Sequence, residues 1–229
     1  MSMYRESVQK EKTPFRIIAV TNRYLSAGDY FERIGRIASS GADAVIVREK
    51  DMTEEEYLPL ARRVLKICEA HGTECVLHNF VNAASELGCR KIHLPLSVLR
   101  ELNCDTGRRE EDRGKAVAPG KPEGRTGILS LFDIVGASVH SRGEAEEAER
   151  LGADYITAGH IFATDCKKGA EPRGTDFLTE IVSAVSIPVY GIGGISRANI
   201  RFVKDAGAAG ACIMSQMMKG DFYEKGGIL

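Results

Sequence analysis

The chain has 229 residues, of which 43% are hydrophobic and 28% charged. This composition is typical of a globular protein with an ordinary core and excludes a disordered or collagen-like chain. Lys and Arg number 31 and Asp and Glu 32, so no basic field is present to hold a phosphate backbone, and we expect no nucleic-acid partner. The length is also that of one α/β barrel, which runs to roughly 200–250 residues.

Cysteine usage and hydropathy indicate a reduced compartment and no membrane partner. The six cysteines form no Cys-x-x-Cys pair, which favours a cytoplasmic protein. The N-terminus is polar, and the uncharged stretch Ala206 to Met218 is too short and too rich in Gly and Ala to span a bilayer. We predict an N-terminal extension over 1–15, a barrel domain over 16–219 and a C-terminal tail over 220–229.

One joint recurs along the chain: a polar, helix-patterned segment ends in Gly and passes into a short apolar run. Gly ends a helix because it adopts the left-handed conformation without penalty, and a short apolar run is typical of a strand buried on both faces. The repeated joint therefore predicts βα units. It occurs five times, at 39–47, 70–78, 86–94, 150–159 and 205–214.

Alternating strands and helices predict the α/β class, with a (β/α)8 TIM barrel as its architecture and a doubly wound open sheet as the competitor. In chain order, the eight expected strands lie near 16–22, 44–50, 75–79, 91–95, 134–140, 155–162, 188–194 and 209–215. The expected helices lie near 29–40, 54–71, 81–87, 142–151, 174–185 and 196–206.

Two segments depart from this pattern. Residues 103–127 are rich in Gly, Pro and charge, which predicts a mobile insertion in place of the fourth helix. The last residues are too short and too often interrupted by Gly for a full eighth helix. A partner in a homodimer could cover the barrel there.

Polar residues end the predicted strands although the strands themselves are apolar. Because a barrel builds its site at the carboxyl ends of the strands, and because polar groups are not buried there without partners, a ligand explains them best. These residues are Asn22, Arg23, Arg48, Lys50, His78, Asn79, His93, Ser138, His140, His160, Thr164, Gly193, Gly194 and Ser215.

Glycines after the seventh strand predict a phosphate site. The run YGIGGIS at 190–196 allows close approach of the backbone at Gly193 and Gly194, and IMSQ at 213–216 adds the main chain of Met214 and Ser215. Main-chain N–H groups at these two places can surround a phosphate. The alternative is that the glycine pair only makes a tight turn.

Basic residues predict a second anion contact. Arg48 and Lys50 are two apart at the end of one strand and point to the same side. The alternative is that they pair with Glu49 or Asp51. Thr164 and Lys167, in a loop after the sixth strand, can fold over an anionic ligand or can simply be solvated.

His140 is the preferred proton carrier, because it follows a buried strand and lies near the barrel axis with Ser138. No histidine or carboxylate pattern gathers into a metal site, so we expect no metal and no cofactor.

Five motifs resemble those of the thiamine phosphate synthase and TenI-like superfamily: VIVREK (45–50), GASVHS (136–141), ADYITAGHIFATDCKKG (153–169), IPVYGIGGIS (187–196) and GACIMS (210–215). The resemblance implies a barrel of thiamine biosynthesis that holds a thiazole phosphate at the glycine turn and the eighth strand. In this superfamily a synthase joins a pyrimidine diphosphate to the thiazole phosphate with Mg²⁺. TenI-like tautomerases aromatise a thiazole carboxylate phosphate without metal.

The residues that separate the two branches lead us to expect a TenI-like thiazole tautomerase, an isomerase. Asn79 and Val98 stand where the synthase has acidic magnesium ligands, and Ile46 stands where it has Gln. His140 would then move the ring proton, and Arg48, Lys50 or Lys167 would bind the carboxylate. The alternatives are thiamine phosphate synthase, a transferase, and a non-catalytic regulator that binds thiazole phosphate.

Overall fold

The computed structural model describes residues 14–104, 127–167, 169–220 and 222. Nearly all of the predicted extension over 1–15, insertion over 103–127 and tail over 220–229 lies outside the described residues. These boundaries therefore stay predictions.

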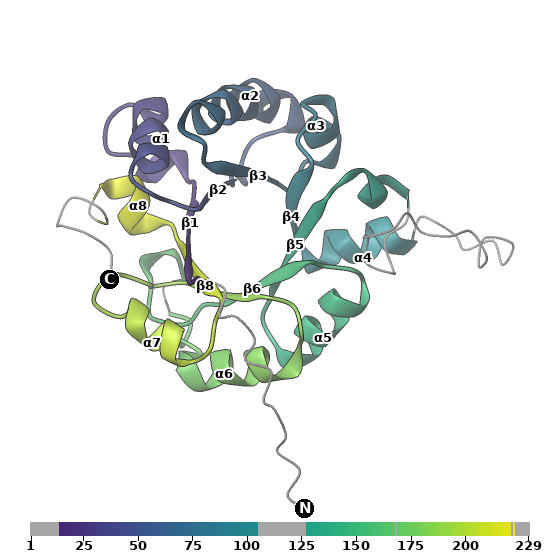
Figure 1. Ribbon diagram of the computed structural model, residues 1–229, viewed down its shortest axis with the longest axis vertical. Coiled ribbons are helices and arrows are strands. Elements are labelled where there is room, and N and C mark those ends of the chain that lie inside the picture. The colour runs from purple at the N-terminus through teal and green to yellow at the C-terminus, as the bar shows by residue number, and fades with distance from the viewer. Residues whose placement is uncertain (1–13, 105–126, 168, 221, 223–229) are drawn as a thin grey trace, which may run out of the picture.

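Eight parallel strands close into a barrel in which each strand pairs with the next and the last pairs with the first (Figure 1). This closure confirms the predicted TIM barrel and excludes the open sheet. The strands are β1 (Arg16–Val20), β2 (Ala44–Val47), β3 (Glu74–His78), β4 (Lys91–Pro95), β5 (Ile134–Val139), β6 (Tyr155–Gly159), β7 (Val189–Ile192) and β8 (Gly210–Ile213).

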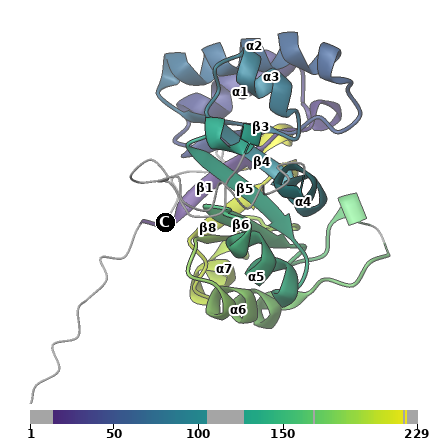
Figure 2. The same ribbon diagram turned by 90° about the vertical axis from the view of Figure 1, so that its right-hand side faces the viewer.

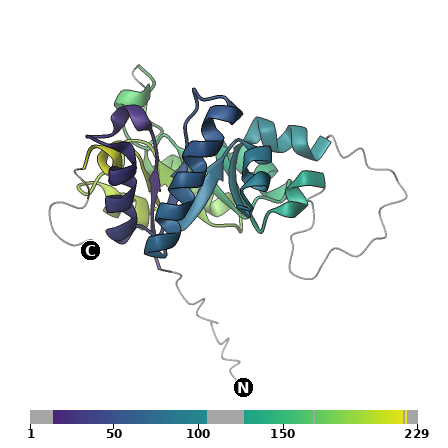
Figure 3. The same ribbon diagram turned by 90° about the horizontal axis from the view of Figure 1, so that it is seen from above.

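Helices surround the ring of strands on its outside, as Figures 2 and 3 show from two further directions. The α-helices are α1 (Tyr30–Ser39), α2 (Glu54–His71), α3 (Val81–Glu86), α4 (Leu96–Cys104), α5 (Arg142–Arg150), α6 (Gly174–Ala184), α7 (Ile200–Asp205) and α8 (Ser215–Lys219). Short 3₁₀ turns are η1 (Arg23–Leu25), η3 (Gly127–Leu131) and η4 (Asp165–Lys167). None of the described helices is long and apolar enough to cross a membrane.

The fourth helix corrects a prediction. Residues 103–127 were expected to replace this helix, yet α4 begins directly after β4 and contains nine residues. Leu96 and Leu99 are buried against the core, so their spacing of three supplies the apolar stripe that a helix needs. Helix α8 is one short turn of five residues; most of the last residues, for which no full eighth helix was expected, lie outside the described residues.

Strand residues divide the core into two parts. Side chains that point outward, such as Ile17 and Ala19, join a large cluster between the strands and the helices. Alternate side chains point to the barrel axis. The axial cluster contains Ile18, Val20, Ala44, Ile46, Val76, Tyr155, Tyr190 and Cys212.

Tyr57 connects α2 to the carboxyl ends of two strands. Its buried hydroxyl donates a hydrogen bond to the Val47 carbonyl oxygen (2.7 Å) and accepts one from the His78 N–H (3.1 Å). The capping box between Thr53 and Glu56 fixes the start of the same helix. Helix α2 therefore holds β2 and β3 in place where both strands reach the barrel mouth.

We predict that Tyr57→Phe lowers the free energy of unfolding by about 1–3 kcal/mol, because it leaves a buried carbonyl and a buried N–H without their shared partner. Urea unfolding monitored by circular dichroism measures this change. Tyr24→Phe is the matched control: Tyr24 is 72% exposed, and its loss should change stability by less than about 0.5 kcal/mol. Equal effects of the two substitutions would contradict the bridging role.

Candidate functional site

A pocket of about 910 Å³ opens at the carboxyl ends of the strands. The structure brings the residues predicted to bind or act on the ligand to this pocket, although they come from five different strand–loop segments. They are Arg48, Lys50, Ser138, His140, Thr164, Lys167, Gly193, Gly194, Met214 and Ser215. Their convergence is a fact of the structure, and their individual roles stay predictions.

Glycines shape the side of the pocket after β7. Gly193 and Gly194 have positive φ angles of 98° and 64°, which side chains other than glycine rarely adopt. A Cβ on Gly193 would lie 2.7 Å from the His160 Cα, and one on Gly194 would lie 2.6 Å from the Phe162 carbonyl oxygen. The glycine pair therefore lets the loop after β6 lie directly against the turn after β7, and both loops face the pocket.

Arg48 and Lys50 point into the pocket because Glu49, between them, is held on the opposite side. The buried Glu49 carboxylate accepts hydrogen bonds from the Thr21 hydroxyl (2.7 Å) and the Arg23 N–H (3.0 Å). Asp51 is bound by Arg23 and by the Tyr24 hydroxyl. The alternative pairing of Arg48 and Lys50 with these two carboxylates is thus not what the structure shows.

Three cations crowd one side of the pocket. Burial lowers the pKa of Arg48, and burial together with the charges of Arg48 and Lys167 lowers the pKa of Lys50. Neither Arg48, Lys50 nor Lys167 forms a salt bridge with another described residue. A cluster of like charges without counterions is a favourable place for an anionic ligand.

His140 lies at the pocket edge, next to the start of α5. The His140 main-chain N–H donates to the Glu144 carboxylate (2.5 Å), and the ring Nδ1 lies 3.5 Å from the same carboxylate. Burial, followed by the charge of Lys167, lowers the pKa of His140, so the ring is neutral at pH 7. Glu144 was not predicted as a pocket residue; it lies in the first turn of α5, where its N–H donates to the Ser141 hydroxyl oxygen (3.2 Å).

Buried polar side chains lie beneath the pocket. His93 Nε2 is 2.8 Å from the Ser138 hydroxyl oxygen, and His93 Nδ1 is 3.1 Å from the Tyr155 hydroxyl oxygen. His78 stacks on His93 with ring centroids 5.8 Å apart. Thr157 and Tyr155 were missed from the sequence, because nothing local shows that a strand residue faces a histidine 62 positions away.

Other strand-end residues take structural positions. The Asn22 side chain caps η1, and Arg23 pairs with Glu49 and Asp51. Asn79 makes a turn with a positive φ of 70°. The His160 Nε2 lies 3.4 Å from the Ala170 carbonyl oxygen, which leaves His160 a packing role at the pocket wall. Arg100, from α4, also lines the pocket and was not predicted, because the fourth helix was not expected.

The closed parallel barrel and its basic pocket at the carboxyl ends of the strands define an α/β barrel with a site for an anionic small molecule. The family model described as "Thiamine monophosphate synthase" matches residues 17–117 and 127–217. The chain therefore belongs to the thiamine monophosphate synthase family.

Similar proteins carry related names. A thiamine-phosphate synthase of Shouchella clausii is 30% identical over 212 residues, which cover 90% of this chain and 89% of the relative. One from Listeria welshimeri is 37% identical and covers 75% of this chain and 74% of the relative. The solved structure of a thiamine phosphate pyrophosphorylase from Pyrococcus furiosus has a TM-score of 0.70 at 26% identity, and covers 91% of this chain and 89% of that one.

These relatives overturn the predicted TenI-like tautomerase and its isomerase activity. They span most of the chain and are named for the synthase, which favours the transferase alternative. The expectation rested on Asn79, Val98 and Ile46, which stand where the synthase has acidic residues and Gln. Uncharged residues at these positions argue against a bound Mg²⁺, but they do not by themselves select an isomerase reaction.

We predict that Gly194→Ala destabilises the protein by roughly 1–3 kcal/mol, because the new Cβ meets main-chain oxygens and the backbone is in a strained region for alanine. The same substitution should weaken binding of inorganic phosphate measured by calorimetry. Gly143→Ala is the matched control: a Cβ there has open space, and alanine in helix α5 should be neutral or stabilising by about 1 kcal/mol. A tolerated Gly194→Ala with unchanged phosphate binding would contradict the packed-turn interpretation.

Proposed function

We propose that this chain is a thiamine-phosphate synthase, which joins a pyrimidine diphosphate to a thiazole phosphate and releases pyrophosphate. One observation carries the proposal: three cations that form no salt bridge with another described residue, Arg48, Lys50 and Lys167, line one pocket together with a glycine turn. That arrangement offers two separate contacts for anions, as two phosphorylated substrates require. The names of the relatives support the same reaction.

The residues have separate tasks in this reaction. The ring nitrogen of the thiazole attacks the methylene carbon of the pyrimidine, so the N–C bond forms while the C–O bond to diphosphate breaks. The electron pair leaves with the diphosphate, and the growing negative charge is stabilised by Arg48, Lys50 and Lys167. Ser138 and Thr164 add hydroxyl hydrogen bonds to the bound anions.

The phosphate of the thiazole is held by the main chain around the glycine turn and the start of α8. These residues are Gly193, Gly194, Met214 and Ser215. Bond formation at the ring nitrogen removes no ring proton, so a general base is not needed there. Neutral His140 then serves as a hydrogen-bonding group at the pocket edge, with its orientation set by Glu144.

The resemblance implies Mg²⁺ for a synthase, and the described residues do not fit it. They contain no group of three or more His, Cys, Asp or Glu side chains placed to hold a metal ion. Asn79 and Val98 carry no charge, and of the two carboxylates that line the pocket, Glu144 is bound to His140. Mg²⁺ needs hard anionic oxygens. The charge of the diphosphate is therefore left to the cationic side chains.

The same lack of carboxylates favours a second candidate, a non-catalytic regulator that binds thiazole phosphate. A regulator needs the glycine turn and the cations but no provision for a leaving diphosphate. The two candidates differ in a single observable, the release of pyrophosphate.

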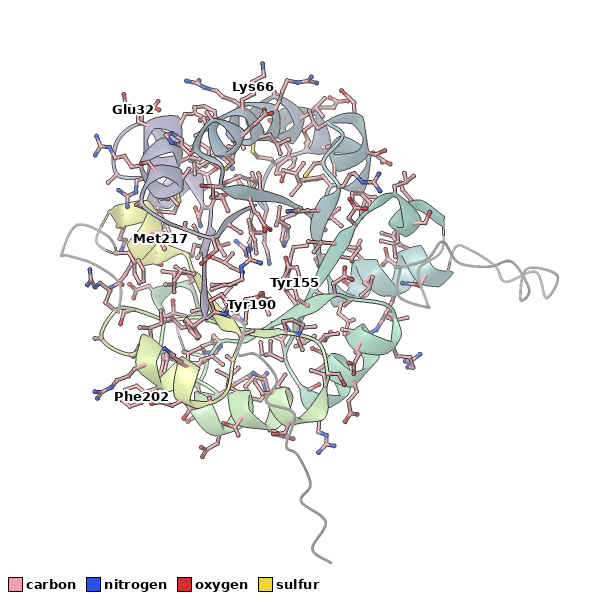
Figure 4. All side chains as sticks on the ribbon, in the orientation of Figure 1. Glu32, Lys66, Tyr155, Tyr190, Phe202 and Met217 are labelled. Atoms are coloured by element: carbon pink, nitrogen blue, oxygen red, sulfur yellow. The ribbon has the colours of Figure 1, made fainter. Side chains whose placement is uncertain are left out.

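We expect the purified protein to release pyrophosphate from the pyrimidine diphosphate only when thiazole phosphate is also present, in an enzyme-coupled pyrophosphate assay. Lys50→Met and Lys167→Met should each lower the rate by about 10- to 100-fold, because each loses a charged contact to the leaving group. Lys66→Met, on the outer face of α2 (Figure 4), is the matched control and should keep the full rate. Binding of thiazole phosphate without any pyrophosphate release would establish the regulator instead.

We also predict a pH limit set by Lys50. Its pKa is lowered by burial and by Arg48 and Lys167, so its amine loses its proton at a lower pH than an ordinary lysine. Pyrophosphate affinity should therefore fall as pH rises through this lowered pKa, because the neutral amine no longer attracts the anion. Calorimetric titrations across the alkaline range measure the fall. Lys50→Arg should shift it to higher pH, and an identical profile in this variant would contradict the assignment.

A further inference from the structure

A chain of polar side chains crosses three neighbouring strands beneath the pocket. It runs from Tyr155 on β6 to His93 on β4 and from there to Ser138 on β5, with distances of 3.1 and 2.8 Å between the polar atoms. His93 is 3% exposed and Tyr155 8% exposed. Ser138 also lines the pocket, so it is the point at which the buried chain meets a ligand.

Gly136 makes this contact between β4 and β6 possible. In the sheet, Gly136 pairs with His93 on one side and with Tyr155 on the other. A Cβ on Gly136 would overlap the Tyr155 ring and lie 2.5 Å from its hydroxyl oxygen. The missing side chain thus lets the Tyr155 ring pass over β5 and reach the His93 Nδ1. Figure 4 shows Tyr155 inside the ring of strands, close to Tyr190.

The direction of each hydrogen bond follows from the Tyr155 hydroxyl. Burial raises the pKa of Tyr155 well above its usual value, so the hydroxyl keeps its proton. Among the described residues, the His93 Nδ1 is the hydrogen-bonding partner of this hydroxyl. A buried donor is costly to leave without an acceptor, so Tyr155 donates and the Nδ1 accepts.

The protonation of the His93 ring sets the direction of the hydrogen bond between His93 and Ser138. Burial, followed by the charge of Arg48, lowers the pKa of His93 to about 3, so the ring is neutral and carries one proton. With Nδ1 accepting, that proton lies on Nε2, which donates to the Ser138 oxygen. The Thr157 hydroxyl, 3.3 Å away, donates to the same oxygen. The Ser138 proton is left free to point toward the pocket.

We propose that Tyr155 and His93 are positioning residues which make Ser138 a hydrogen-bond donor to an anionic oxygen of the ligand. In the opposite arrangement Ser138 donates to the His93 Nε2, so the ring proton lies on Nδ1. The Nδ1 proton and the Tyr155 hydroxyl proton then face each other, and one of these two protons has no acceptor. The inference rests on the proposed function for the identity of the ligand, whereas the direction of the hydrogen bonds depends on the protein alone.

Nitrogen-15 NMR of the histidine side chains in the ligand-free protein tests the direction. We expect the His93 signals of a neutral ring protonated at Nε2, unchanged between pH 5.5 and about 8 because the His93 pKa is about 3. His93→Gln assigns the signals by their disappearance. A ring protonated at Nδ1, or a ring that becomes charged in this pH range, overturns the proposal. The result does not depend on whether the protein releases pyrophosphate.

Tyr155→Phe tests the effect on the ligand. Without the phenol, nothing favours the Nε2 proton, so the Nδ1-protonated form of His93 should appear and the affinity for inorganic pyrophosphate should fall by about three- to tenfold. Ser138→Ala should lower the affinity by at least as much, and combining it with Tyr155→Phe should add little. Tyr190→Phe is the control, because Tyr190 packs against the Tyr155 ring while the Tyr155 hydroxyl bonds His93; this substitution should leave both readouts unchanged.

Two outcomes of the variant series count against the proposal. Unchanged His93 protonation in Tyr155→Phe shows that the phenol does not set the tautomer. Fully additive losses of affinity in the double variant show that Tyr155 acts on the ligand by a route other than Ser138. A failed synthase assay with the expected NMR and pyrophosphate results rejects the proposed function and leaves this inference in place.

Discussion

Closure of the parallel sheet is the constraint on which the rest of the structure depends. Once β8 pairs with β1, all eight strands end at one mouth, and alternate residues of each strand must fill the axis. Apolar side chains such as Ile18 and Ala44 fill part of the axis. Nearer the mouth the same alternation brings in Ser138 and Thr157, which are polar and need partners. The pocket and its buried hydrogen-bond chain are both consequences of this geometry.

Charge is distributed unevenly around that mouth. The carboxylates of Glu49 and Asp51 are close in sequence to Arg48 and Lys50, yet they are bound by Thr21, Arg23 and Tyr24 on the other side of the chain. Side-chain alternation alone separates them. The result is a pocket whose cations repel one another. Burial, together with the charges of Arg48 and Lys167, lowers the pKa of Lys50, and this unfavourable arrangement makes binding of an anion favourable.

Three glycines have structural tasks that a side chain would prevent. Gly193 and Gly194 allow two loops to lie against each other at the phosphate side of the pocket, and Gly136 allows an aromatic ring to cross a strand beneath it. The first two follow a strand in a recognisable glycine run. Gly136 lies inside β5, where a glycine weakens a strand unless close approach requires it.

The sequence by itself determined the eight strands, a pocket at their carboxyl ends and the placement of Arg48 and Lys50 on one side, because periodicity and glycine joints are local signals. The same local signals missed the fourth helix. The Gly, Pro and charged residues of 103–127 indicated an insertion in its place, although Leu96 and Leu99 have helical spacing. Local signals also favoured the wrong reaction, because the uncharged residues Asn79 and Val98 oppose a bound Mg²⁺ without selecting a particular chemistry. Only the tertiary structure decided that His93 meets Tyr155 and that Arg100 reaches the pocket. Those contacts join residues far apart in the chain, and closure of the barrel, rather than any sequence pattern, brings them within hydrogen-bonding distance.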